Sequence, residues 1–146
     1  MSNEHTVKSY EEELKYLIDS VIKMGSLTET QLVDSMDAII KVDKDSIDKI
    51  IKSDDEINKF RSKIDTQIMT LLDKRAPMAI DLRETISSLK ISQDLERIGD
   101  LSKSNAKKVK PLPLDLPEEL LGNLKRLGDL VTVSYTHLTL PTTPYV

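Results

Sequence analysis

Apolar residues recur at every third or fourth position along most of the chain, the spacing that places them on one face of an α-helix. A first helical pattern begins near Tyr10 and lasts about 30 residues. A second pattern runs from Asp45 to about Arg75, where a proline interrupts the periodicity, and a third continues to about Lys108. Three long segments joined by short connections predict an all-α fold, namely an up-down-up antiparallel three-helix bundle over residues 1–110.

A proline-rich stretch and a further helix follow this predicted bundle. The prolines make residues 111–117 a stiff linker. The helix expected over residues 118–133 repeats the residue types of the first helix at an offset of 110 residues, beginning with Leu124 in place of Leu14. We therefore expect it to begin a second, incomplete bundle. Its apolar face would lack partner helices, which predicts self-association of the chain as a homodimer or larger homo-oligomer.

The last residues have a different composition. Residues 134–146 contain no Asp, Glu, Lys or Arg, but several threonines and two prolines. The peptide that begins at Ser134 resembles the translation of a transposon end used in preparing DNA sequencing libraries. We therefore expect residues 134–146 to be a non-native or disordered tail.

Composition narrows the class of protein further. The chain has 146 residues, of which 38% are hydrophobic, 32% charged and only 3% aromatic, a balance typical of helix bundles. It has no cysteine, so disulfides and thiolate metal sites are excluded. The sequence shows no signal peptide and no apolar run long enough to enter a membrane, which predicts a cytoplasmic location. A net charge of −4 disfavours nucleic acid as a partner.

An acidic pair interrupts an apolar stripe on the third predicted helix. At the 100° per residue of an α-helix, Leu82, Ile86 and Leu89 lie on one meridian. Glu96 and Asp100 continue the same meridian, four residues apart. Because such an apolar stripe should face the core, we expect both carboxylates to face other parts of the protein.

The second predicted helix carries a matching polar interruption at Asp54 and Asn58. We place the turn between the second and third helices at Ala76. The number of residues from Asp54 to this turn equals the number from the turn to the centre of the Glu96 and Asp100 pair. Equal rise per residue on antiparallel helices then places both interruptions at one level. Carboxylates brought together in this way would be paired with Arg61 or Arg97, or bridged by a cation.

Two kinds of site satisfy this arrangement. Carboxylate and amide oxygens on facing helices bind hard cations, so we predict a site for divalent or ferric metal ions, such as iron, manganese, zinc, calcium or magnesium. Its ligands would be Glu96, Asp100, Asp54 and Asn58. The alternative is an ion-pair network between the helices without any metal.

Several segments together resemble the PhoU family of regulators of bacterial phosphate uptake. They are Ser9-Tyr10-Glu11-Glu12-Glu13-Leu14, Pro77-Met78-Ala79-Ile80-Asp81-Leu82-Arg83, Leu89-Lys90-Ile91 and Asp94-Leu95-Glu96-Arg97-Ile98-Gly99-Asp100. The resemblance extends over about residues 6–133. It implies a fold of two consecutive three-helix bundles, of which this chain holds the first and the opening of the second.

The same resemblance implies a function and a set of partners. Members of the family are cytoplasmic proteins that restrain the phosphate-starvation response by contacting the ATPase subunit of the phosphate ABC transporter and the phosphate sensor histidine kinase. In some members paired acidic motifs bind multinuclear metal clusters. Glu96 and Asp100 match such a motif in full. Asp54 and Asn58 depart from it, because an amide is a neutral and weaker ligand.

The resulting prediction is regulatory binding rather than catalysis. We expect a helical adaptor that negatively regulates phosphate uptake and phosphate-starvation signalling. The sequence contains no glycine-rich phosphate loop and no nucleophile–base arrangement, which favours binding over an enzyme. Two alternatives are a metal-dependent enzyme built on the helical carboxylates and a structural helical interaction module.

Overall fold

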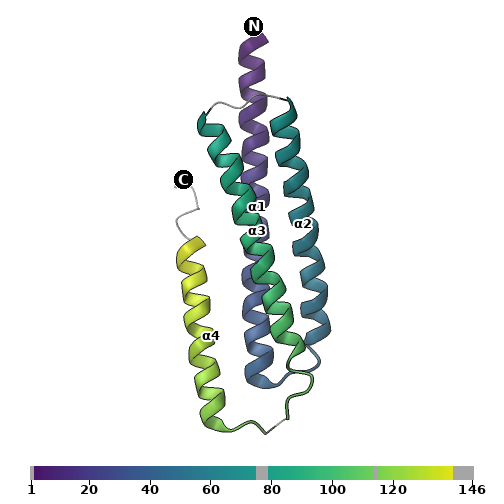
Figure 1. The fold of residues 1–146 in the computed structure, drawn as a ribbon, viewed down its shortest axis with the longest axis vertical. Helices are drawn as coiled ribbons and strands as arrows, with labels where there is room; N and C mark the ends of the chain where they lie inside the picture. Colours follow the sequence, from purple (N-terminus) through teal and green to yellow (C-terminus); the bar gives the residue numbers. More distant parts are fainter. Residues whose placement is uncertain (1, 75–78, 114, 140–146) are drawn as a thin grey trace.

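The computed structural model describes residues 2–74, 79–113 and 115–139, and within these ranges the chain forms helices and no strand. The helices are α1 (Ser2–Lys41), α2 (Ile47–Lys74), α3 (Ala79–Lys107) and α4 (Glu118–Thr139). The first three run alternately up and down beside one another, and each contacts the other two (Figure 1). The predicted all-α bundle is therefore confirmed. Among the described helices, none combines the length and the apolar run that a membrane span requires.

The connection between α1 and α2 is organised by Asp43. Val42 ends α1 in the left-handed region, with a φ of 51°, and the Asp43 amide donates to the Ala38 carbonyl over 2.9 Å. The Asp43 carboxylate accepts hydrogen bonds from the backbone amides of Asp45 at 3.0 Å and Ser46 at 3.2 Å. Hydrogen bonds from the Ser46 hydroxyl and amide lower the pKa of Asp43. Hydrogen bonds within the turn therefore stabilise the Asp43 carboxylate, and the turn directs α2 back along α1.

Buried positions follow a heptad pattern in all three bundle helices, with alternating spacings of three and four residues. On α1 this pattern includes Tyr10, Leu14, Leu17, Met24, Thr28, Gln31, Ser35 and Ala38; on α2, Ile47, Ile50, Asp54, Ile57, Ile64, Ile68 and Leu71; and on α3, Thr85, Ser88, Ser92, Leu95, Gly99, Ser102 and Ala106. The buried Val42 and Val109 continue the spacing just past the ends of α1 and α3. Leucine, isoleucine and methionine fill much of the core from α1 and α2. Small or hydroxylated residues dominate the buried face of α3.

This buried face of α3 corrects the predicted one. Leu82 and Ile86 were expected in the core, yet their exposed fractions are 40% and 36%. Ser92 and Ser102 are buried instead, and each hydroxyl donates to a carbonyl of its own helix over 2.8 Å. Such bonds remove most of the cost of burying a hydroxyl, while the small side chain allows close helix approach. The predicted orientation of the apolar stripe, and with it the inward facing of Asp100, is wrong.

The fourth helix lies along α1 outside the three-helix bundle (Figure 1). Gly128 faces Met36, and the Tyr135 hydroxyl donates to the Gly25 carbonyl over 2.7 Å. The helix continues past Val133 to Thr139, and Tyr135 is only 7% exposed. Residues 134–139 are thus helical, and the expectation of disorder is wrong for them; residues 140–146 lie outside the described residues. The foreign origin of the tail and the second bundle stay predictions.

Candidate functional site

Asp54 is the centre of a charged layer in the bundle core. Asp54 lies on α2 and is completely buried. One carboxylate oxygen, Oδ1, accepts a hydrogen bond from Gln31 Nε2 of α1 at 3.2 Å. The other oxygen, Oδ2, accepts one from Asn58 Nδ2 at 3.3 Å and pairs with the ammonium of Lys103 on α3. One buried carboxylate therefore connects all three helices of the bundle.

Gln31 joins this carboxylate to the backbone of α3. Its Nε2 also donates to the Gly99 carbonyl over 2.8 Å. Because both partners of Nε2 are acceptors, they fix the orientation of the amide. Gly99 allows the close approach of α3, because a Cβ there would lie 3.2 Å from Ile57 Cδ1, a tight contact, and 3.5 Å from Asp54 Oδ1.

Lys103 supplies the positive charge of the layer from the solvent side. Its side chain is 25% exposed, whereas that of Asp54 is 1% exposed. The ammonium also lies 3.8 Å from Asp100 Oδ1, on a side chain that is 59% exposed. The hydrogen bond to Asp54 is the main reason why the pKa of Lys103 is raised above its ordinary value. Lys103 therefore stays charged under physiological conditions.

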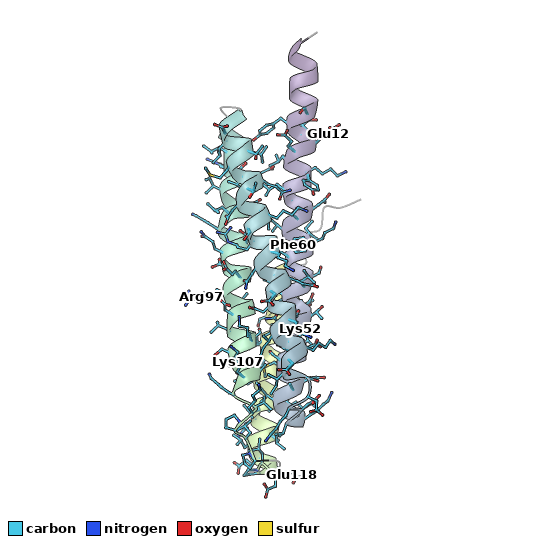
Figure 2. All side chains as sticks on the ribbon, turned by 90° about the vertical axis from the view of Figure 1, so that its right-hand side faces the viewer. Glu12, Lys52, Phe60, Arg97, Lys107 and Glu118 are labelled. Carbon is cyan, nitrogen blue, oxygen red and sulfur yellow. The ribbon has the colours of Figure 1, made fainter. Side chains whose placement is uncertain are left out.

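A second ion-paired group involves Arg61 of α2. The Arg61 side chain is only 13% exposed, and its Nε lies 3.3 Å from Glu96 Oε2 on α3. Its guanidinium also pairs with Asp65 one turn along α2. Arg97, the other base considered from the sequence, is exposed on the outer side of α3 (Figure 2). Of the two predicted bases, Arg61 alone pairs with the acidic set.

The structure bears on the predicted ligands in two ways. The expected common level is confirmed, since Asp54 lies beside Gly99, between Glu96 and Lys103 in the sequence of α3. Asp54 and Glu96 do not converge at that level, because each pairs with a different base, whereas Asp54 and Asp100 both contact the ammonium of Lys103. Sequence reasoning missed Gln31 and Lys103. The available signal was that Gln31, like Asp54, occupies a buried heptad position.

The donor set does not fit a metal ion in this arrangement. Asn58 directs its Nδ2 toward Asp54, so its amide already donates a hydrogen bond to the neighbouring predicted ligand. Asp54 faces an ammonium where a shared cation would stand. Within residues 2–74, 79–113 and 115–139, no three His, Cys, Asp or Glu side chains are placed to hold a metal. Metal binding at Glu96, Asp100, Asp54 and Asn58 stays a prediction.

Comparison with known families gives a match over most of the bundle. Residues 21–109 match the model of the PhoU domain. This range contains every residue of the two ion-paired groups, from Gln31 on α1 to Lys103 on α3. No solved structure matches the chain significantly.

Curated relatives extend the match beyond the bundle. A phosphate-specific transport system accessory protein PhoU homolog of Rhizobium meliloti is 37% identical over 134 residues, which cover 91% of this chain and 56% of the relative. A PhoU homolog of Caulobacter vibrioides is 38% identical over 129 residues, 88% of this chain and 56% of that protein. The accessory protein PhoU of Edwardsiella tarda is 32% identical over 126 residues, 86% of this chain and 52% of that protein. The chain thus spans about half the length of these relatives.

Proposed function

The chain belongs to the PhoU family, and from that premise we propose that it is a helical accessory protein of phosphate transport that restrains phosphate uptake and phosphate-starvation signalling. The observation that carries this proposal is the coincidence of the family match with the folded bundle: residues 21–109 include the second half of α1 and all of α2 and α3. The relatives are named for a phosphate-specific transport system. Regulation by binding is the activity that such a bundle supports best.

The proposed partners are the ATPase subunit of the phosphate ABC transporter and the phosphate sensor histidine kinase, both met in the cytoplasm. Support comes from the relatives' names and from exposed apolar side chains on α3, where Leu82 is 40% and Leu101 58% exposed. Exposed apolar side chains of this kind commonly contribute to protein–protein contacts.

Binding of purified proteins tests this proposal. The chain would be passed over the immobilised ATPase subunit, and separately over the cytoplasmic part of the kinase, from the same genome. We expect retention by at least one of them; retention by neither would overturn the proposed partners. Leu82→Glu should weaken retention if α3 contributes to the contact, and Ser87→Glu, at another exposed position of α3, is the matched control. Equal retention of both variants would place the contact elsewhere.

Restraint of signalling needs a test in cells. In bacteria that lack their own PhoU homolog, the chain should lower the output of a phosphate-starvation reporter when phosphate is plentiful. An unchanged reporter, with the chain shown to be present and helical, would contradict negative regulation by this chain.

We also propose that the chain self-associates through α4. This helix uses Gly128 and Tyr135 against α1, which leaves Leu127 57% and Leu130 65% exposed on its other side. Each buried Å² of apolar surface stabilises association by about 25 cal/mol. Light scattering should give a mass above one chain, and Leu127→Glu with Leu130→Glu should reduce it, whereas Asn123→Glu on α4 should not.

We propose that the chain acts by binding partner proteins and not by catalysing a reaction. The competing reading is a metal-dependent enzyme that uses Glu96, which lies beside Arg61 at 3.3 Å. Hydrolytic or redox turnover that disappears in Glu96→Gln would favour that enzyme. A structural interaction module would be favoured if changes to the acidic residues altered neither stability nor partner binding.

A further inference from the structure

We propose that the ammonium of Lys103 is the built-in cation of the core layer, and that this bundle neutralises its buried carboxylate with a tethered charge in place of a metal ion. The inference rests on the contacts around Asp54 and does not depend on the proposed regulatory function. It concerns the one acidic side chain of the predicted ligand set that is completely buried.

The buried carboxylate needs a positive partner. An ionised carboxylate without a counter-charge is among the most costly groups to remove from water. Asp54 has two neutral donors, Gln31 Nε2 and Asn58 Nδ2, at 3.2 and 3.3 Å. These donors satisfy hydrogen bonds but leave the negative charge in place. The ammonium of Lys103 is the only group in contact with this carboxylate, among the described residues, that cancels it.

Lys103 also stands in the path that a metal ion would take. Asp54 is completely buried, and two of its partners, Lys103 at 25% and Asn58, are themselves partly exposed. Its ammonium lies between Asp54 and the more exposed Asp100, 3.8 Å from the latter. A divalent cation bridging these two carboxylates would be repelled by the fixed positive charge that already contacts both of them.

The second group repeats the arrangement about two helical turns away. Arg61, with its side chain 13% exposed, lies against Glu96 and Asp65. A guanidinium remains charged at any pH at which proteins are folded. Two bases, one from α2 and one from α3, therefore occupy the positions between the helices where bridging cations would be expected.

Melting curves with and without Mn²⁺ test the proposal. Lys103→Met keeps the aliphatic length and removes the charge, and Lys107→Met changes an exposed lysine one turn further along α3 as the matched control. Mn²⁺ would be added at about 1 mM, a concentration high enough to occupy a weak metal site. We expect it to leave the melting temperature of the wild type unchanged. Lys103→Met should melt at a lower temperature and recover part of the loss when Mn²⁺ is added, whereas Lys107→Met should show neither effect.

A double variant separates metal binding at Asp54 from binding elsewhere. Asp54→Asn combined with Lys103→Met removes both charges, so it should regain much of the lost melting temperature and show no response to Mn²⁺. A Lys103→Met response that persists in the double variant would overturn the proposal, as would the absence of any Mn²⁺ response in a folded Lys103→Met. Wild-type stabilisation by Mn²⁺ that disappears in Asp54→Asn would overturn it as well.

Paramagnetic broadening decides the matter even if Lys103→Met does not fold. In wild-type protein labelled with ¹⁵N, Mn²⁺ bound at the layer would broaden the amide signals of Asp54, Gly99 and Lys103. We expect these three signals to persist at equimolar Mn²⁺, no weaker than signals from buried core positions such as Ile64. Their selective loss would show that a metal enters the layer despite Lys103.

Discussion

Gly99→Ala and Gly122→Ala make the same chemical change on two helices, and the structure gives them opposite consequences. Alanine in a helix interior is favoured over glycine by about 1 kcal/mol. At Gly122 nothing lies within 4 Å of the added Cβ, so most of that gain should appear as stability. At Gly99 the Cβ would lie 3.2 Å from Ile57 Cδ1, and Ile57 is fully buried.

The magnitude for Gly99→Ala follows from this contact. Ile57 can move only within a packed core, and overpacking of this kind costs about 1–3 kcal/mol. Subtracting the gain in helix propensity leaves a net loss of up to about 2 kcal/mol. Gly99→Leu should lose more, because its additional atoms must displace Asp54 or Ile57. Gly122→Ala should gain about 0.5–1 kcal/mol.

Urea unfolding followed by circular dichroism measures both changes. A shift of the midpoint at constant slope reports a change in stability, and a change of slope reports altered compactness. The reasoning would be refuted if Gly99→Ala stabilised the chain as much as Gly122→Ala. That result would mean that α3 does not approach α2 as closely as Gly99 implies.

Three further predictions concern charge. Lys103→Met should destabilise the chain by about 3–5 kcal/mol in urea unfolding, since it leaves the buried Asp54 carboxylate without a counter-charge; a loss below 1 kcal/mol would contradict the pairing. The pKa of Lys103 is raised in the folded protein, so the stability that the Lys103–Asp54 pair contributes is fully present below the pKa of an unfolded lysine and is lost as pH rises through the folded pKa. The melting temperatures of wild type and Lys103→Met should therefore converge above about pH 10.4. In absorbance titrations Tyr16, whose pKa the hydrogen bond with Lys63 lowers, should ionise before Tyr135, whose pKa burial raises to about 12; simultaneous ionisation of the two would contradict the burial of Tyr135.

The helices and their antiparallel order were predictable because their signal is periodic. Spacings of three and four residues are repeated often enough along each segment to survive local exceptions. The face of α3 was not predictable from apolar residues alone. Its buried side is made of hydroxyl groups such as Ser92 and Ser102, which bond to their own helix and therefore behave as small, satisfied side chains. A prediction based only on the positions of apolar residues therefore assigns the wrong face of α3 to the core.

Only part of the candidate site, Asp54 and its level along the bundle, could be predicted from the sequence. Asp54 could be recognised because a carboxylate in an otherwise apolar heptad position must face the core. Its level relative to α3 followed from the rise per residue. The identity of its counter-charge could not be derived, because Lys103 reaches Asp54 through a long side chain from a position 49 residues away. Gln31 is likewise brought to the layer only by the packing of α1.

The polar layer also explains why these three helices adopt one register. A heptad pattern of apolar residues permits neighbouring helices to slip by a heptad, since one layer of leucine or isoleucine resembles the next. A slip of α3 by one heptad would move Lys103 about 10 Å along the bundle axis and leave Asp54 buried without a counter-charge. It would also separate Gln31 from the Gly99 carbonyl, which it now reaches at 2.8 Å. Because the observed register pairs Asp54 with Lys103 and brings Gln31 Nε2 to the Gly99 carbonyl, the layer favours that register, whereas the apolar core supplies most of the burial.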